Sequence, residues 1–225
     1  MTEPPKPARE PPAERLATRL DAGSKRPTLV AVLRDLGRLD LAVYRAIAAT
    51  PTPTLDEPLR RLSDVATRSK LWLGIAGGMA VVGGKTGRRA ALSGIAALAV
   101  DSAAVNLAGK LLFRRRRPNP ADAGVPQGRR VEMPTSHSFP SGHAASGFAF
   151  AEAVGEITPA VAMPLRLLAA AVAYSRVHTG VHYPGDVIGG ALIGSSIGEA
   201  VGLGARWIQT RRRARPGSGP DPRRP

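Results

Sequence analysis

Three short stretches of the sequence carry residue types suited to chemistry on phosphorus. The first lies between Lys110 and Pro118, the second covers residues 140–143, and the third extends from Arg176 to Asp186. Together they supply three histidines, one carboxylate and several permanent cations. Arginine and lysine bind phosphoryl oxygens, and an oriented imidazole is a competent nucleophile. The three stretches therefore contain the groups needed to hold a phosphoryl group and transfer it to a histidine nitrogen.

The third stretch contains the predicted nucleophile. His182 directly precedes a helix that Pro184 is expected to begin, because proline favours the first helical position. Asp186 then falls in the first turn, where it can accept a hydrogen bond from one imidazole nitrogen and leave the other lone pair free. Asp186 also suits the positive end of the helix dipole, and this structural role is compatible with the catalytic one. Arg176 offers a planar fork for two phosphoryl oxygens.

The second stretch predicts a helix start that binds an anion. Ser141 is a typical N-cap, with Gly142 and His143 as the first helical residues. Unpaired backbone N–H groups at a helix start suit a phosphate oxygen, and glycine lets the anion approach the backbone closely. An ordinary capped helix start is the structural alternative.

The first stretch combines basic residues at helical spacing. Lys110, Arg114 and Arg117 stand at positions i, i+4 and i+7, which predicts one helical face. Pro118 disfavours helical conformation at Arg117, so we expect this face at the end of a helix, over the mouth of a pocket. Interfacial arginines that stop a membrane helix are the alternative. Lys110 and Arg117 are phosphate-binding candidates, and Arg114 is an auxiliary candidate.

The remaining histidines raise the question of a metal. His178, His182 and Asp186 recur every four residues, as ligands on one helix do, but Gly180 argues against a continuous helix. No metal site is therefore predicted. His137 is expected in a solvated loop or at the pocket entrance. The chain has no cysteine, which excludes a thiolate zinc site and a thiol nucleophile.

The elements that would position these residues are predicted to be helices. Residues 28–50 and 55–69 have amphipathic periodicity, the first as one helix or as two divided near Gly37. Five alanine- and glycine-rich segments with few charges follow, at residues 71–84, 90–109, 144–154, 161–174 and 187–205. Antiparallel alternation brings all three stretches to the same end of a bundle. The predicted fold is an all-α membrane bundle of about five apolar helices, preceded by amphipathic helices.

The membrane interpretation depends on composition. Small residues favour close helix contacts in a bilayer, but none of the five segments reaches about 18 uninterrupted apolar residues. A soluble bundle is therefore the alternative, and the amphipathic helices suit a protein core or a membrane interface equally well. Basic residues at 85–89 and 206–215 share the end opposite the predicted site. The positive-inside tendency then predicts a multi-pass protein of the cell membrane with an extracytoplasmic site.

Charge and composition define the remaining regions. The chain has 225 residues and a formal net charge of +15, which favours an anionic partner such as nucleic acid, an acidic membrane surface or a phosphorylated substrate. We expect a disordered arm at residues 1–27, amphipathic helices at 28–69, a bundle at 70–210 and a disordered basic tail at 211–225. A nonenzymatic nucleic-acid-binding protein is an alternative, but the chain has few aromatic residues for base stacking, so no nucleic-acid partner is predicted.

The three stretches together resemble the signature of the type 2 phosphatidic acid phosphatase superfamily. Six residues separate Lys110 from Arg117-Pro118, and Pro140-Ser141-Gly142-His143 follows. Five residues separate Arg176 from His182, and three separate His182 from Asp186. The resemblance implies that His182 forms a phosphohistidine, that Asp186 orients it, and that His143 protonates the leaving oxygen and later activates water. It also implies that the phosphoryl oxygens are bound, without a metal or another cofactor, by Lys110, Arg117, Ser141, Gly142 and Arg176.

The resemblance implies a membrane phosphatase that acts on a lipid phosphate or a polyprenyl diphosphate. Phosphatidic acid, phosphatidylglycerol phosphate and a prenyl-linked sugar phosphate present the same phosphoryl group, so the sequence leaves the substrate open, as it does the oligomeric state. A soluble acid phosphatase or a vanadate-dependent haloperoxidase on the same scaffold is the alternative.

Overall fold

The computed structural model describes residues 28–111 and 114–214, together with the isolated positions 11 and 14. The side chains of residues 108–111 and 212–214 are outside this description. The predicted arm at residues 1–27 therefore lies almost entirely outside the described residues, and so does the predicted tail from residue 215 onward.

The described ranges are helical and contain no β-strand, which confirms the predicted all-α fold. Most helix boundaries lie within a few residues of the prediction, but two helices are longer. Helix α5 begins at Gly84, whose φ of 58° permits the reversal from α4. Helix α8 continues to Ala214, so the first residues of the predicted disordered tail are helical. The elements in order are α2 (Leu29–Ala49), α3 (Pro53–Val65), η1 (Thr67–Ser69), α4 (Lys70–Val82), α5 (Gly84–Leu111), η2 (Gln127–Arg129), α6 (Gly142–Gly155), η3 (Pro159–Val161), α7 (Ala162–His178) and α8 (Pro184–Ala214).

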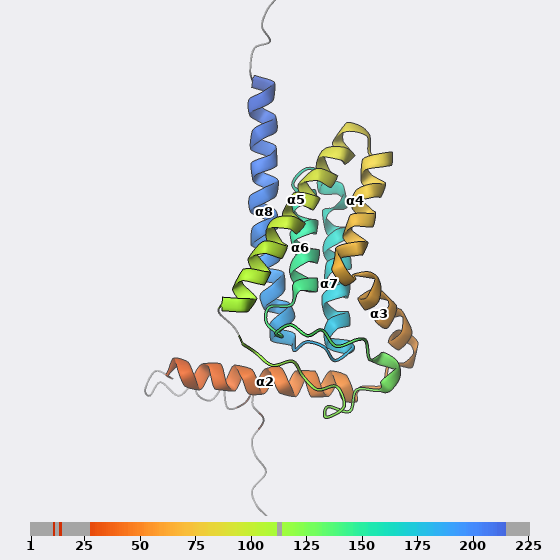
Figure 1. Ribbon diagram of the computed structural model, residues 1–225, viewed down its shortest axis with the longest axis vertical. Coiled ribbons are helices and arrows are strands. Elements are labelled where there is room, and N and C mark those ends of the chain that lie inside the picture. The colour runs from red at the N-terminus through yellow and green to blue at the C-terminus, as the bar shows by residue number, and fades with distance from the viewer. Residues whose placement is uncertain (1–10, 12–13, 15–27, 112–113, 215–225) are drawn as a thin grey trace, which may run out of the picture.

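Helices α4 to α8 form an up-and-down bundle, and α6 lies inside it against α5, α7 and α8 (Figure 1). Helix α8 approaches α6 closely through glycines spaced four residues apart, at positions 190, 194, 198 and 202. A Cβ atom at Gly194 would overlap the backbone of Ala145, and one at Gly198 would overlap that of Ala149. The glycine stripe therefore sets the distance between these two helices, as small residues do in membrane bundles.

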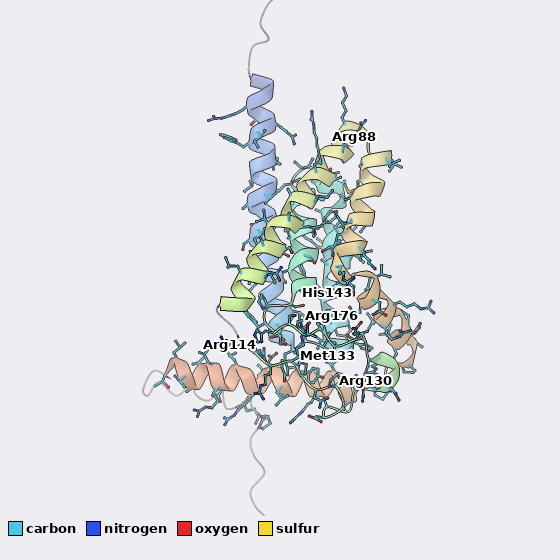
Figure 2. All side chains as sticks on the ribbon, viewed as in Figure 1. Arg88, Arg114, Arg130, Met133, His143 and Arg176 are labelled. Carbon is cyan, nitrogen blue, oxygen red and sulfur yellow. The ribbon has the colours of Figure 1, made fainter. Side chains whose placement is uncertain are left out.

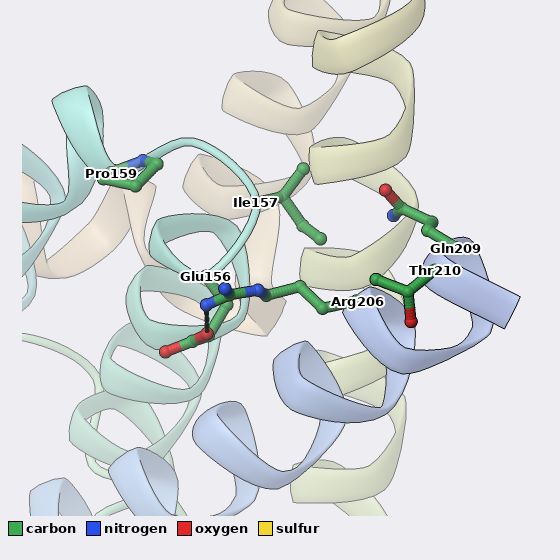
Figure 3. A pocket seen from close by; sticks show the side chains of 6 residues that line it. All are labelled: Glu156, Ile157, Pro159, Arg206, Gln209 and Thr210. Atoms are coloured by element: carbon green, nitrogen blue, oxygen red, sulfur yellow. Dashed lines mark hydrogen bonds and ion pairs between the residues drawn. The ribbon is translucent and has the colours of Figure 1, made fainter. Parts of the chain in front are cut away.

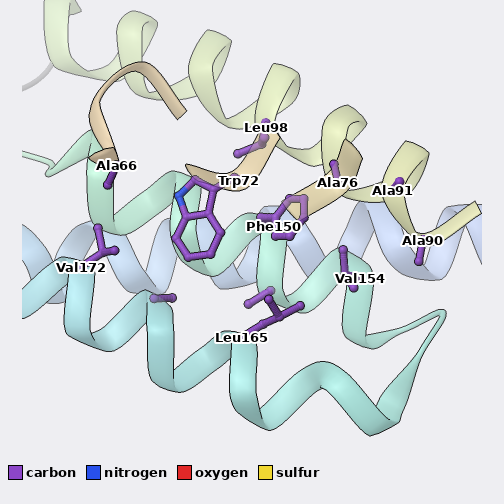
Figure 4. Close-up of a cluster of buried hydrophobic side chains, with 12 residues drawn as sticks. Ala66, Trp72, Ala76, Ala90, Ala91, Leu98, Phe150, Val154, Leu165 and Val172 are labelled. Atoms are coloured by element: carbon purple, nitrogen blue, oxygen red, sulfur yellow. The ribbon is translucent and has the colours of Figure 1, made fainter. Parts of the chain in front are cut away.

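The largest apolar cluster lies between α4, α5, α6 and α7 (Figure 4). Trp72 and Phe150 are fully buried there, with their ring centroids 5.5 Å apart. Leu98, Leu165 and Val172 pack around them. This cluster packs the four helices against one another and so holds the bundle together.

The two amphipathic helices lie at one end of the bundle. Helix α2 is continuous through Gly37 and lies crosswise below the bundle, while α3 leads from it towards α4 (Figure 1). Asp40 and Tyr44, one turn apart, face the protein interior. Leu33 and Leu36 are about half exposed and line a hollow between α2 and the start of α8.

Three helical spans are long and apolar enough to cross a membrane: Gly84–Leu107, Pro159–His178 and Pro184–Arg211. Helices α4 and α6, with 13 and 14 residues, are shorter than the roughly 17 residues that a span needs. Many large apolar side chains on the outer faces of the bundle are exposed, as a lipid environment requires. They include Leu73, Val81, Val82, Leu92, Leu107, Met163, Leu167, Ile188, Leu192 and Leu203.

Candidate active site

The three predicted stretches meet at the end of the bundle covered by α2. Helix α5 ends there, α6 and α8 begin there, and α7 ends there, as antiparallel alternation predicts (Figure 1). Figure 2 shows His143 and Arg176 close together at this end, with Arg88 at the other. Arg117, Gly142, His143 and His182 line one hollow with a volume of about 350 Å³. The hollow adjoins residues from each stretch, so we take it as the candidate active site.

His182 lies between the carboxylate of Asp186 and the guanidinium of Arg117. Its Nδ1 lies 3.5 Å from Oδ2 of Asp186, and its Nε2 lies 3.0 Å from Nη1 of Arg117. A guanidinium has only donors, so Nε2 must be the acceptor. In a neutral imidazole the proton is then on Nδ1, facing Asp186, and the Nε2 lone pair is directed at Arg117, beside the hollow that both residues line. This is the tautomer that a nucleophilic Nε2 requires.

Burial sets the charge of this imidazole. His182 is 2% exposed, and its burial lowers the pKa of the side chain to about 4, against an opposing effect of Asp186. The nearby Arg117 lowers the same pKa further. His182 is therefore neutral at physiological pH.

Asp186 is held by a second set of donors. Its Oδ1 accepts a 2.8 Å hydrogen bond from Arg115, and its Oδ2 accepts bonds from the Ser138 hydroxyl and, at 2.9 Å, from the backbone N–H of Tyr183. The carboxylate is fully buried, so each of these donors offsets its loss of hydration. Sequence reasoning missed Arg115 and Ser138, although Arg115 belongs to the basic run 114–117.

Arg117 lies on an extended segment, which corrects the predicted helical face. Helix α5 ends at Leu111, and no helix is present at residues 114–119, so the i, i+4, i+7 arrangement does not form. The guanidinium of Arg117 donates to Val181 O at 2.9 Å and to Ser136 O at 2.8 Å, besides facing His182. Proline at position 118 explains the extended backbone. Arg114 is exposed and is not among the residues lining the hollow, and the Lys110 side chain is outside the described residues.

The α6 start is built as predicted, with one difference. Ser141 has the extended backbone of an N-cap and Gly142 begins the helix, but the Ser141 side chain makes no capping bond. Its buried Oγ has no hydrogen-bond partner among the described residues, and neither does Nε2 of His143. A Cβ at Gly142 would meet only Val105, at 3.8 Å, so the approach to this backbone is open. Ser141 Oγ and His143 Nε2 are therefore available to hydrogen-bond a ligand at an accessible helix N-terminus.

Arg176 reaches the same region from the end of α7. Its side chain is buried, and one guanidinium nitrogen donates to the hydroxyl of Ser63, which is itself fully buried on α3. Its backbone carbonyl accepts bonds of 3.1 Å from the N–H groups of Val181 and His182. The Arg176 guanidinium is therefore held in place by Ser63, and the Arg176 backbone holds the loop that carries His182.

Helix α2 forms hydrogen bonds with the loop that carries His182. Oδ1 of Asp40 accepts a 2.7 Å bond from the N–H of Gly185, and Oδ2 accepts a 2.5 Å bond from Arg115. The hydroxyl of Tyr44 donates to the carbonyl of Gly180 at 3.2 Å, and burial raises the pKa of Tyr44 to about 12, so it remains a donor. No local sequence signal identified Asp40, which is 146 positions from Asp186 in the chain.

The other two histidines have different surroundings. His178 is buried, and its Nε2 lies 2.9 Å from the Thr52 hydroxyl and 3.3 Å from Asp56. Its partners are therefore on α3 and the residue before that helix, and His178 does not form a row of ligands with His182 and Asp186. No cluster of three or more potential metal ligands occurs among the described residues. His137 lines the hollow, which agrees with the expected position at its entrance.

A separate hollow at the opposite end lacks comparable groups (Figure 3). It has a volume of about 320 Å³ and is bordered by an ion pair of 2.7 Å between Arg206 and Glu156. Its other lining residues are Ile157, Pro159, Gln209 and Thr210. Without a nucleophile or a histidine, this hollow offers no route to phosphoryl chemistry.

Comparison with known proteins decides the family. The model of the PAP2 superfamily matches residues 90–213, from α5 to the last turn of α8. The chain belongs to the PAP2 superfamily. This confirms the predicted phosphatase family and leaves α2, α3 and α4 outside the matched PAP2 region.

Relatives of this PAP2 protein are prenyl-lipid phosphatases. A decaprenylphosphoryl-5-phosphoribose phosphatase of Mycobacterium tuberculosis H37Rv is 33% identical over 73% of this chain and 89% of its own length. The enzyme of the same name from Mycolicibacterium smegmatis is 35% identical over 67% of this chain and 78% of its own. An undecaprenyl-diphosphatase of Sulfolobus acidocaldarius is 45% identical, but over only 28% of this chain and 32% of its own.

Two solved structures share the fold. Aquifex aeolicus LpxE has a TM-score of 0.56 and 26% identity, covering 72% of this chain and 94% of its own. A transmembrane PAP2-type phosphatidylglycerolphosphate phosphatase from Bacillus subtilis also has a TM-score of 0.56, with 20% identity over 89% of this chain and 96% of its own. Both structures show the fold of this PAP2 protein, in which three helical spans are long and apolar enough to cross a membrane.

Proposed function

We propose that this PAP2 protein is an integral-membrane phosphatase that removes a terminal phosphoryl group from a prenyl-linked lipid through a phosphohistidine on His182. The observation that carries the proposal is the position of His182 at the hollow, with Nε2 beside the Arg117 guanidinium and Nδ1 facing Asp186. A nucleophile fixed by a carboxylate and placed beside a cation is suited to in-line attack on a bound phosphoryl group.

The first step transfers the phosphoryl group to the enzyme. Nε2 of His182 attacks phosphorus, a P–N bond forms, and the P–O bond to the leaving group breaks. Burial and the neighbouring cations lower the pKa of His143 to about 3 in the free protein, and the bound phosphoryl dianion raises this pKa. His143, protonated in the complex, donates its proton to the leaving oxygen, so the lipid departs as a neutral alcohol. Asp186 stabilises the positive charge that develops on His182. Arg117, Arg176, Lys110 and the α6 N-terminus bind the phosphoryl oxygens, and the bound dianion favours the protonated form of His143 among these cations.

The second step releases inorganic phosphate. Neutral His143 accepts a proton from a water molecule as its oxygen attacks phosphorus. The P–N bond breaks, its electron pair returns to Nε2 of His182, and His143 is left protonated for the next cycle. Each chemical role is filled by a residue of this chain, so we expect full activity in the presence of a chelator such as EDTA.

The substrate class follows from the relatives together with the apolar outer surface. Two of them are named for decaprenylphosphoryl-5-phosphoribose and one for undecaprenyl diphosphate. We infer a prenyl-linked phosphomonoester as the preferred substrate, ahead of phosphatidic acid or phosphatidylglycerol phosphate. The prenyl chain would remain in the bilayer while the phosphate reaches the hollow at the end of the bundle.

A phosphate-release assay on purified lipids in detergent tests this proposal. We expect kcat/KM for a prenyl-linked phosphomonoester to exceed that for phosphatidic acid by about tenfold or more. Protein carrying His182→Ala measures the background. Release of phosphate from none of the lipids above that background would refute the proposed function.

We also propose that several spans cross the membrane with the site outside the cytoplasm. Lys85, Arg88 and Arg89 lie at the end of the bundle opposite the site, where positive charge favours the cytoplasmic side. At the site end, Arg115, Arg117 and Arg129 are engaged in ion pairs or hydrogen bonds within the fold. Because the chain lacks cysteine, single cysteines at Lys85 and Ala123 can be labelled with an impermeant reagent in intact cells. Labelling at position 85 instead of 123 would reverse the orientation.

A further inference from the structure

A second hollow adjoins the candidate active site. Its volume is about 210 Å³, and it lies between η1, α5 and the first turns of α6. Val105, Asn106, Gly142 and His143 line both hollows. Because His143 faces both, a group bound in the second hollow lies directly beyond the predicted proton donor. This is the position that the leaving group occupies when the phosphoryl group lies against His182.

The second hollow contains a buried carboxylate that needs a donor. Asp101 is 2% exposed, and its Oδ1 has no hydrogen-bond partner among the described residues. A buried carboxylate oxygen without a donor is costly, so such an atom in a native protein calls for a ligand or water. Asp101 lines the hollow, and donors of a bound molecule can therefore reach it.

The other polar groups of this hollow are hydroxyls and an amide. Ser69, Ser102, Asn106 and Ser146 line it, and Ser146 already donates to the His143 carbonyl at 3.3 Å. They provide both donors and acceptors, as a neutral polyhydroxylated ligand requires. An apolar prenyl chain would offer these groups no further hydrogen-bond partners.

The rim of the hollow is formed by a constrained turn. Arg68 and Ser69 have positive φ angles of 54° and 57°, a conformation that residues other than glycine rarely adopt. Non-glycine residues in this region are concentrated at functional sites, where the surrounding structure holds them. Here the conformation brings an exposed guanidinium to the mouth of the hollow.

We propose that the Asp101 hollow is a sugar subsite, which holds the monosaccharide of a prenyl-linked sugar phosphate while the terminal phosphate lies against His182. Carboxylates accept hydrogen bonds from neighbouring sugar hydroxyls, as the acidic residue of dinucleotide-binding folds does from ribose. The volume suits one sugar ring. Arg68 at the rim is placed to meet the phosphodiester that joins the sugar to the prenyl chain. The inference rests on the proposed function and specifies its substrate.

The same carboxylate would disfavour a lipid diphosphate. In that substrate the group next to the leaving oxygen is a second phosphate, and its charge would be repelled by Asp101. Sugar phosphate and diphosphate therefore make opposite demands on one side chain, and this difference makes the proposal testable.

The experiment compares two substrates with the same prenyl chain, a prenylphosphoryl ribose 5-phosphate and a prenyl diphosphate, in detergent. For Asp101→Asn and Asp101→Ala we expect kcat/KM to fall about ten- to a hundredfold with the sugar phosphate and to stay equal or rise with the diphosphate. Asp122→Asn, an exposed loop carboxylate outside both hollows, is the matched control and should change neither value. Equal losses on both substrates, or no loss on either, would overturn the sugar subsite.

A measurement on the wild-type protein guards against variants that fail to fold. Free ribose 5-phosphate should inhibit at least about tenfold more strongly than glycerol 3-phosphate, because only the sugar supplies ring hydroxyls to Asp101. Equal inhibition by the two compounds would also overturn the subsite. Absence of phosphate release from either lipid by the wild-type protein would instead refute the proposed function itself.

Discussion

The two histidines of the candidate site differ in how much of their environment the protein supplies. His182 is buried between Asp186 and Arg117, and Asp186 is fixed in turn by Ser138, Arg115 and the Tyr183 backbone. Nε2 of His143 has no hydrogen-bond partner among the described residues and borders two hollows. The predicted nucleophile is therefore preorganised, whereas the predicted acid is completed by its substrate.

This difference has a physical reason. A nucleophile must present one lone pair in one direction before the substrate arrives, so fixing it in advance lowers the cost of reaching the transition state. A general acid must gain and lose a proton in each cycle, and a permanent carboxylate partner would hold it in one state. Ligand-dependent pairing of His143 avoids that restriction.

Removal of the preorganised histidine is expected to have the largest effect. His182→Ala should lower kcat by more than about a thousandfold, because no other group can form the covalent intermediate. Rapid quenching with labelled substrate should trap an acid-labile phosphoryl group on the wild-type protein and none on the variant. Turnover within about tenfold of wild type would contradict the assignment of the nucleophile.

Removal of His143 should lower the rate by an amount that depends on the leaving group. His143→Ala is expected to lower kcat about a hundredfold or more with an alkyl phosphomonoester, whose oxygen needs a proton. With p-nitrophenyl phosphate, whose leaving group is stable as an anion, the loss of phosphoryl transfer should be much smaller in burst-phase kinetics. An equal loss of burst rate with both compounds would contradict the acid role.

Two arginines of the same basic run should differ in effect. Arg117→Lys keeps the charge but loses the planar fork that contacts Ser136, Val181 and His182, and kcat/KM should fall about a hundredfold. Arg114→Lys is the matched control, because Arg114 is exposed and lies away from the hollow. Steady-state kinetics in detergent measure both. A comparable loss at Arg114 would restore the auxiliary role expected from the sequence.

Removal of the α2 contacts that position the His182–Asp186 pair should have a moderate effect on kcat. Asp40→Asn removes the charge that holds Arg115 and weakens the bond to Gly185, so kcat should fall about tenfold with KM nearly unchanged. Tyr44→Phe, which loses only a 3.2 Å bond to Gly180, should have a smaller effect. A rise in KM without a change in kcat would show that α2 contributes to substrate binding and does not position the His182–Asp186 pair.

The smallest expected effect is that of mild acid on the wild-type protein. Since the pKa of His182 is lowered to about 4, the nucleophile stays neutral as pH falls from 7 to about 5. After correction for the substrate phosphate, which titrates near about 6, kcat/KM should not be lost over this range through protonation of His182. It should fall about tenfold per pH unit only below about 4. Loss of activity with a midpoint near the ordinary value of about 6.5 would contradict the preorganised, buried state.

The same shift has a consequence for stability. The unfolded chain protonates this histidine at an ordinary pKa of about 6.5, whereas the folded protein does so only at about 4. The unfolded state therefore binds more protons between these values, and the free energy of unfolding decreases as pH falls through this window.

Local patterns in the sequence were sufficient for the helices and for the signature. Apolar periodicity and the small-residue segments predicted the bundle, Ser141 and Pro184 marked two helix starts, and antiparallel alternation brought the three stretches to one end. These features depend on near neighbours in the chain and on simple connectivity. The spacing of Lys110, Arg114 and Arg117 was misleading, because helical spacing has meaning only while the helix continues, and α5 ends at Leu111.

Only the tertiary structure revealed the groups that hold the site. Asp40, Ser63 and Ser138 reach it from α2, α3 and a loop, and no motif marks them, because their partners are far away in the chain. The tautomer of His182 and the unpaired Asp101 are likewise consequences of folding, since both depend on which donors a buried atom meets. The sequence by itself determined which residues are predicted to perform the chemistry. Packing decided how they are oriented and charged, because burial and hydrogen-bond partners exist only after the chain has folded.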